Sequence, residues 1–178
     1  SNVSEDAKVQ TIAEARFMRG VAYWYISSLW GCAVIYDNTA NLVNNYIVSP
    51  CSRVDGIEFA IRDLEYAAKF LPAKSLGEGR VNKYSAYGML SRVYLSMAGL
   101  TTSGQYNGTN IQTDFNTGIR NPYYLDLTKK AALKVINESD ASLLDDYSKL
   151  FDASTIDNNS ESLFQLQFLA GTNVGGAA

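Results

Sequence analysis

The stretch AEARFMRGVAYWYISSLWG, residues 13–31, decides how the rest of this chain of 178 residues is interpreted. It forms the larger part of a predicted helix that starts at the N-cap Ser4 and ends near Leu29. At about 100° per residue, its apolar side chains cover roughly half of the helix circumference, which predicts burial on more than one side. These side chains are Phe17, Met18, Val21, Ala22, Trp24, Tyr25, Ile26 and Leu29.

Charged and polar side chains divide between the two faces of this helix. Glu14 falls inside the apolar arc, whereas Arg16, Arg19, Tyr23 and Ser27 fall on the narrower opposite face. A buried carboxylate without a partner is costly. We therefore expect Glu14 to pair with a cation from elsewhere in the fold.

Three further helices are expected, over residues 52–71, 82–98 and 128–137. The first opens with a capping box of Ser52 and Asp55 and ends before Pro72, and Asn82 caps the second. Residues 31–50 have no helical period and are interpreted as a long ordered loop, and residues 99–124 as a second long excursion. The stretch SLFQLQF, residues 162–168, alternates apolar and polar side chains. It predicts a short strand, which must pair with another strand to be stable.

The fold class expected from these elements is mainly α, with long loops and a short C-terminal strand. Repeated helix pairs, with small contact residues on the helix over residues 82–98, suggest a tetratricopeptide-like array, and an ordinary helical bundle is the alternative. Length alone predicts one domain or a large piece of one.

Composition argues against several classes of function. The net charge of -3, from 15 basic and 18 acidic residues, gives no attraction to nucleic acid or to an anionic membrane surface. The sequence contains no histidine, so it lacks the commonest general base and metal ligand. Cys32 and Cys51 fit neither a disulfide framework nor a metal-ligand spacing, although one bridge between them is an alternative to two partly buried thiols. We expect no catalytic residue, no metal site and no cofactor.

Trp30, at the end of the first predicted helix, has two interpretations. It can plug the core, or its indole can be a flat apolar platform on which a sugar ring stacks. The loop after it offers side chains that can hydrogen bond to hydroxyl groups, and a further aromatic ring. The candidate ligand-binding residues are therefore Trp30, Asp37, Asn38, Asn41, Asn45 and Tyr46.

Four blocks of the sequence resemble, in the same order, conserved blocks of the SusD/RagB family. They are AEARFMRGVAYWYISSLWG (13–31), SRVDGIEFAIRDLEYAAKFLP (52–72), GRVNKYSAYGMLSRVYLSMAG (79–99) and DDYSKLFDASTIDNNSESLFQLQF (145–168). The resemblance implies tetratricopeptide-like helix pairs, an alpha-alpha superhelix, packed against a more irregular region. It also implies that residues 1–178 are a single SusD-like helical domain fragment, incomplete at both ends relative to the family.

The resemblance implies a function in nutrient capture. Members of the family are lipid-anchored proteins on the outer-membrane surface of Bacteroidota. This implies binding of glycans or related nutrients and their delivery to a SusC-like TonB-dependent transporter, without catalysis, with membrane contact only through an upstream lipid anchor. The alternative is a purely structural scaffold for the transporter, with the ligand site in another part of the protein.

The resemblance also implies structural roles for charged residues. Glu14 and Arg16 match the family's recurring Glu-x-Arg positions, and Arg92 is the first candidate partner of Glu14 on a neighbouring helix. Glu14, Arg16 and Arg92 are therefore the expected structural residues. We then expect Glu14→Ala to lower the free energy of unfolding by about 3 kcal/mol, as for a buried pair that loses one partner.

Overall fold

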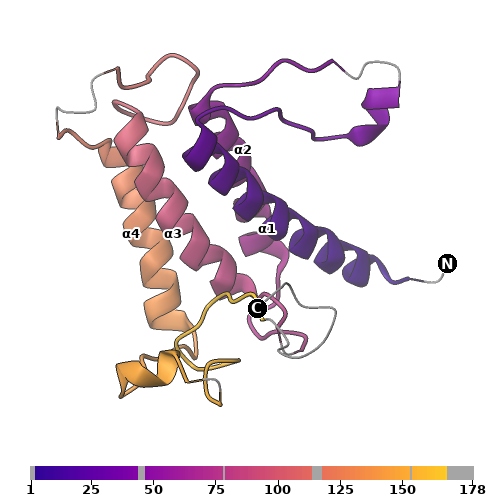
Figure 1. Ribbon diagram of the computed structural model, residues 1–178, viewed down its shortest axis with the longest axis vertical. Coiled ribbons are helices and arrows are strands. Elements are labelled where there is room, and N and C mark those ends of the chain that lie inside the picture. Colours follow the sequence, from indigo (N-terminus) through magenta and orange to yellow (C-terminus); the bar gives the residue numbers. More distant parts are fainter. Residues whose placement is uncertain (1–2, 44–46, 78, 114–117, 153, 168–178) are drawn as a thin grey trace.

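The computed structural model describes residues 3–167, apart from 44–46, 78, 114–117 and 153. The body of the described chain consists of the helices α1 (Glu5–Trp30), α2 (Arg53–Phe70), α3 (Lys83–Leu100) and α4 (Pro122–Glu138). Two short 3-10 helices, η1 (Thr39–Val43) and η2 (Tyr147–Leu150), lie in the connecting segments. Figure 1 shows α1 beside α2 and α3 beside α4, and contacts between α2 and α3 join the two pairs. The predicted class, mainly α with paired helices, is confirmed.

Side chains at the helix N-termini explain where the helices begin. Ser4 accepts a hydrogen bond from the Ala7 N–H, and Ser52 and Asp55 form the predicted capping box. α4 begins at Pro122 rather than near residue 128, because Asn121 caps it and proline is favoured in the first helical turn. The other boundaries lie within two residues of the predicted ones.

The buried surface of α1 agrees only in part with the predicted apolar arc: Phe17 and Val21 of the arc are buried as predicted. Tyr23 and Ser27, which the projection assigned to the opposite face, are buried. Three residues of the predicted arc are instead between 45% and 69% exposed: Met18, Tyr25 and Leu29. A Cβ atom added at Gly20 would lie 2.9 Å from Cγ of Leu64, so α2 approaches α1 closely at this glycine. Close approach at small residues selects the packed face of α1, rather than the number of large apolar side chains on it.

One core joins the two helix pairs. Large, fully buried apolar side chains come from all four helices: Phe17, Ile57, Leu64, Val93, Met97 and Tyr124. Burying each aliphatic or Phe side chain of this kind contributes about 1.5–3 kcal/mol to stability. The helix pairs therefore pack on each other as one unit.

The predicted strand over residues 162–168 is wrong for the part that the structure describes, residues 162–167, which contain no strand. Instead, the Phe164 ring packs edge-on against Phe17, with 5.0 Å between ring centroids, and Leu163 lies against Gly88 of α3. Phe168 lies outside the described residues. Burial does not follow the alternation, because Leu163 and Phe164 are partly buried whereas Leu166 is 63% exposed.

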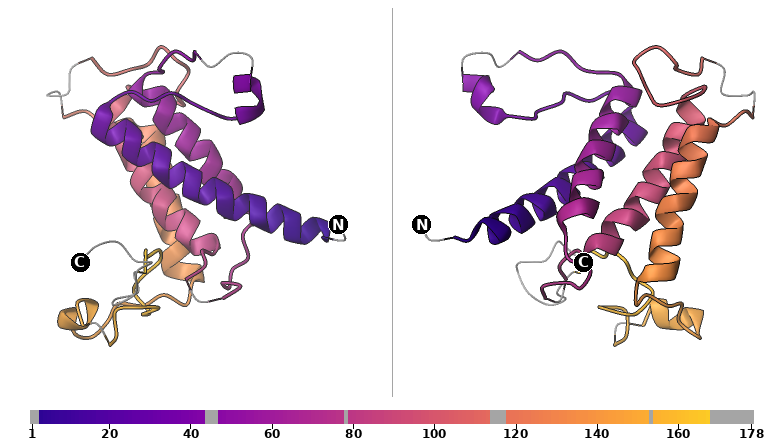
Figure 2. Two further views of the ribbon diagram at one scale, coloured as in Figure 1. Left: turned by 45° about the vertical axis from the view of Figure 1, so that its right-hand side comes forward. Right: turned by 180° about the vertical axis from the view of Figure 1, so that it is seen from behind.

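Both long loops lie at the same end of the helix pairs, because α1 and α3 end there and α2 and α4 begin there (Figures 1 and 2). The first loop is closed at its base by a bridge in which the Cys51 N–H donates to the Ala33 carbonyl oxygen at 2.7 Å. Cys32 and Cys51 are free thiols, so the alternative of a disulfide is not realised. Within the described ranges, no helix has the length and apolar character that crossing a bilayer demands.

Candidate functional site

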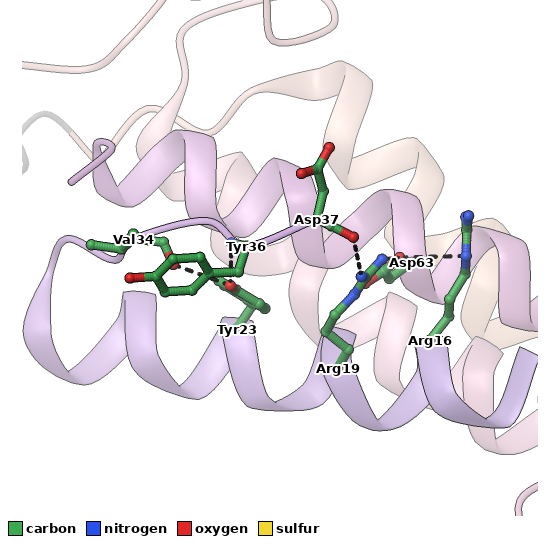
Figure 3. Close-up of polar contacts among 7 residues, drawn as sticks. All are labelled: Arg16, Arg19, Tyr23, Val34, Tyr36, Asp37 and Asp63. Carbon is green, nitrogen blue, oxygen red and sulfur yellow. Dashed lines mark hydrogen bonds and ion pairs between the residues drawn. The ribbon is translucent and has the colours of Figure 1, made fainter. Parts of the chain in front are cut away.

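The loop after α1 folds back along the helix that precedes it. The Tyr23 hydroxyl donates a hydrogen bond to the Val34 carbonyl oxygen (3.1 Å) and accepts one from the Tyr36 N–H (2.8 Å), as Figure 3 shows. Tyr23 is 9% exposed, and its ring packs edge-on against Phe59 of α2. The loop main chain is therefore attached to a buried phenol whose position is fixed by both helices.

A buried ion pair holds the next part of the same loop. The Asp63 side chain, 3% exposed, accepts hydrogen bonds from Nε (2.6 Å) and Nη2 (2.8 Å) of Arg19. The third guanidinium nitrogen, Nη1, lies 3.4 Å from the Asp37 carbonyl oxygen and donates to it (Figure 3). Hydrogen bonding to Asp63 raises the pKa of Arg19 above its ordinary value. Arg19 therefore connects α1, α2 and the loop through one charged group.

The structural residues predicted from the sequence have other partners than expected. Glu14 pairs with Arg80, in the turn before α3, through two hydrogen bonds of 2.9 and 2.7 Å. The predicted pairing of Glu14 with Arg92 is wrong: Arg92 lies over the Trp24 ring, 5.6 Å from its centroid. Arg16 lies over Tyr66 at 4.1 Å, and its Nε is 3.9 Å from Asp63.

The predicted ligand-binding residues lie at the surface wherever the structure describes them. Trp30 is 70% exposed, so the interpretation as a core plug is wrong and the indole is free to act as a platform. Asp37 and Asn38 are exposed, and Asn38 Oδ1 accepts the Ala40 N–H at the start of η1. Asn41 has its main chain in η1, but its side chain is not described, and Asn45 and Tyr46 lie outside the described residues.

The structure separates Trp30 from Asp37. The main chain of Asp37 is bonded to Arg19, and Trp30 lies eleven residues further along α1. At a rise of about 1.5 Å per residue, these two positions are about 16 Å apart along the helix axis. The sequence suggested one cluster of ligand-binding groups, whereas the fold distributes them along one side of α1.

The second long loop is attached to the base of the first, a connection that the sequence analysis did not find. The Tyr106 hydroxyl donates to Asp55 in the capping box of α2 at 2.6 Å, and the Tyr106 N–H donates to the Tyr124 hydroxyl at 3.0 Å. The buried Asn121 side chain donates to Thr101 Oγ1 and to a loop carbonyl. Asparagine and tyrosine are abundant in this region of the sequence, but nothing in their spacing identifies these pairs.

The Asp55 and Tyr106 contact shifts both acidities. Hydrogen bonds from Ser52 and from Tyr106 lower the pKa of Asp55. Burial, followed by the hydrogen bond to the carboxylate, raises the pKa of Tyr106 to about 12. Both groups therefore keep their ordinary charge states at neutral pH, and their contact is a structural attachment.

Two apolar grooves lie on the helix faces, away from these loops. One, of about 370 Å³, runs between α3 and α4 and is lined by Tyr87, Tyr94 and Leu127, among others. The other, of about 480 Å³, lies between α1, α3 and α4 beside Phe164. Grooves of this size can hold small ligands. In stacked helix pairs, however, such surfaces are also where neighbouring elements pack.

The described residues contain no group of three or more Cys, Asp and Glu side chains placed to hold a metal ion. The adjacent carboxylates Asp145 and Asp146 lie at the start of η2, where Asp146 caps the short helix by accepting the Ser148 N–H. They serve as turn residues.

Comparison with known proteins identifies relatives for almost the whole chain. Residues 1–95 match the model of a protein family described as starch-binding and associating with the outer membrane. A SusD-like protein of Bacteroides ovatus is 34% identical over 94% of this chain, and a SusD-like protein of Formosa agariphila is 23% identical over 93% of it. The chain spans only 28% and 27% of the lengths of these two relatives.

Solved structures agree with this comparison. A protein crystallised with a xylogluco-oligosaccharide superimposes with a TM-score of 0.78 at 33% identity, covering 94% of this chain and 31% of that one. A SusD homologue of Bacteroides thetaiotaomicron superimposes with a TM-score of 0.75 at 23% identity, covering 98% of this chain and 31% of the other. At that lower identity the likeness concerns the fold alone.

Proposed function

Because this chain belongs to the SusD-like family, whose model matches residues 1–95 of its 178, we propose that it is part of a cell-surface glycan-binding protein. The protein binds glycans or related nutrients and delivers them to a SusC-like TonB-dependent transporter in the outer membrane. It performs no catalysis, and a lipid anchor elsewhere in the protein holds it at the membrane surface.

The observation that carries the proposal is the exposed Trp30 beside a loop whose main chain is fixed. An indole that is 70% exposed at the end of a rigid helix presents an apolar face to solvent without reorganisation. Sugar rings stack on such faces, and the exposed Asp37 and Asn38 side chains can accept or donate hydrogen bonds to hydroxyl groups. The xylogluco-oligosaccharide in the structure of a relative 33% identical to this chain adds support from outside the molecule.

A structural scaffold for the transporter is the second candidate function. It is favoured by the exposed apolar side chains of α4, among which Ile136 is 72% exposed, and by the separation of Trp30 from Asp37. In this alternative the ligand site lies wholly in another part of the protein, and Trp30 has no part in binding.

Tryptophan fluorescence and a glycan array distinguish the two candidates. The sequence contains two tryptophans, and Trp24 is half-buried with its indole N–H 3.3 Å from Ser96, so Trp30 is the one accessible to a sugar. We expect Trp30→Ala to weaken glycan binding about tenfold, or about 1.4 kcal/mol, and to abolish ligand-dependent quenching. Leu29→Ala, at a neighbouring side chain 69% exposed, is the matched control. Unchanged binding by Trp30→Ala would favour the scaffold.

Association with the transporter needs its own measurement. We expect the longest natural form of the chain to co-purify with a TonB-dependent transporter from solubilised outer membranes. Recovery without any transporter would contradict the delivery step, while leaving glycan binding to be judged from the array.

A further inference from the structure

We propose that residues 30–38 form an extended track for a neutral, linear oligosaccharide, in which Tyr36 is a stacking platform between Trp30 and Asp37. This rests on the proposed function, binding of a glycan at this loop. The new element is Tyr36, which is not among the ligand-binding residues predicted from the sequence. The proposal also specifies the size and the charge of the ligand.

The path of the loop places Tyr36 between the two ends. The Tyr36 N–H donates a hydrogen bond to the Tyr23 hydroxyl, and the Asp37 carbonyl oxygen accepts one from Arg19. Because Arg19 precedes Tyr23 in α1, the loop runs toward the N-terminus of this helix. Tyr23 precedes Trp30 by seven residues of helix, which at about 1.5 Å per residue is about 10 Å. In Figure 3 the Tyr36 side chain extends along α1 toward Val34, and therefore toward the end of the helix that carries Trp30.

Burial along the loop shows which of its sides faces solvent. Ala33 is 7% exposed, and both Ala33 and Ile35 pack with Tyr23 in a small cluster under the loop. Cys32 is exposed and Tyr36 is 40% exposed, so the outer side of the loop carries the aromatic ring. Two exposed aromatic side chains, Trp30 and Tyr36, therefore follow each other along the loop. The exposed polar residues Asp37 and Asn38 come directly after them.

The spacing sets the size of the ligand. Arg19, which holds the Asp37 carbonyl, and Trp30 are eleven residues apart on α1, or about 16 Å along the helix axis. A ligand that contacts both Trp30 and Asp37 therefore needs several linked sugar rings. Because hydrogen bonds hold the main chain at Tyr36 before any ligand arrives, stacking on its ring has to order the side-chain torsions but not the loop backbone. Each added sugar that reaches the next platform should therefore strengthen binding.

The charges favour a neutral glycan. Arg16 and Arg19 are matched by the carboxylates of Asp63 and Asp37, so these four groups carry no net charge. Figure 3 shows the Asp37 carboxylate turned away from the guanidinium group of Arg19, and Asp37 is exposed. It can accept hydrogen bonds from sugar hydroxyls there, whereas it would repel the carboxylate of an acidic sugar.

The test is calorimetric titration of the longest natural form of the chain with glucose, cellobiose, cellotetraose and cellohexaose. We expect the affinity to rise steeply with length until the oligosaccharide reaches from Trp30 to Asp37. Tyr36→Ala should weaken binding of cellohexaose about tenfold, or about 1.4 kcal/mol, and leave the thermal midpoint unchanged, because its attachment to Tyr23 is through the main chain. Tyr147→Ala, at a tyrosine 74% exposed in η2 at the opposite end of the molecule, is the matched control.

Each outcome distinguishes the track from the function on which it rests. Glucose binding as tightly as cellohexaose, or a Tyr36→Ala variant that matches its parent along the whole series, overturns the track even where Trp30→Ala still weakens binding. Tighter binding of a uronic acid oligomer than of the neutral one overturns the assignment of charge. An absence of binding to every oligosaccharide on the array contradicts the proposed function itself.

Discussion

Replacing Asp63 with asparagine removes the charge that connects α1, α2 and the first long loop. The carboxylate is 3% exposed and accepts two hydrogen bonds from Arg19, of 2.6 and 2.8 Å. Asparagine keeps the shape but offers one oxygen and one NH₂ group, so one of the two guanidinium donors faces another donor. The loss therefore combines an ion pair with an unsatisfied hydrogen bond.

The magnitude follows from the burial of the two partners. Removing one partner of a buried ion pair costs about 3–5 kcal/mol. Because the Arg19 side chain is 32% exposed and can regain contact with water, we expect the lower end for Asp63→Asn, about 3 kcal/mol. In a chain of 178 residues, where each kcal/mol lowers the midpoint by about 2–4 °C, this corresponds to about 6–12 °C.

Urea unfolding followed by far-ultraviolet circular dichroism measures this loss, and thermal unfolding gives the midpoint. Asp126→Asn is the control, because Asp126 is 55% exposed and pairs with Lys130 at the surface, where loss of a pair is within experimental error. Hydrogen exchange at residues 34–38 should also accelerate in Asp63→Asn, since Arg19 then holds the Asp37 carbonyl less firmly. A variant within about 0.5 kcal/mol of its parent, the range of ordinary surface substitutions, would refute the reasoning.

Three further predictions follow from the same contacts. Glu14→Ala should cost much less stability than Asp63→Asn, and less than the roughly 3 kcal/mol expected from the sequence for a buried pair, because the side chains of Glu14 and Arg80 are 23% and 46% exposed; equal losses in urea unfolding would contradict this. Tyr23→Phe removes both hydrogen bonds to the loop and should cost about 1 kcal/mol per bond, with faster amide exchange at Tyr36; an unchanged exchange rate there would argue against the attachment. Tyr106→Phe removes a bond that lowers the pKa of Asp55. The contribution of ionised Asp55 to the free energy of unfolding is present above the unfolded pKa of about 3.9 and is lost as the pH falls through the lowered folded pKa. The free energies of unfolding of the parent and of Tyr106→Phe should therefore become equal in acid. A difference that persists at the lowest pH would disprove this linkage.

Local signals in the sequence were sufficient for most of the secondary structure. Ser52 and Asp55 satisfy each other and the first turn of α2 without help from the rest of the fold, so their capping box is visible as a pattern. The late predicted start of α4 missed the cap at Asn121 and the proline that follows it. That error came from the loop-like composition around the cap.

Prediction was weaker where a partner comes from a distant segment. The predicted partner of Glu14 was on a neighbouring helix, whereas its actual partner, Arg80, lies in the connection between α2 and α3. Large apolar residues defined the predicted arc of α1, and Tyr23 therefore fell on the narrower opposite face. The close approach at Gly20 turned that face toward α2 instead.

By itself, the sequence determined the order and approximate bounds of the four helices, the positions of both long loops and the resemblance to a family. These follow from periodicity, caps and composition, which depend on neighbours within a few residues. Only the tertiary structure decided which face of α1 is buried, that Arg19 and Tyr23 attach the loop, and that Trp30 and Asp37 lie apart. The physical reason is that burial, ion pairing and the spacing of side chains depend on which segments meet, and segments distant in the chain meet only in the folded protein.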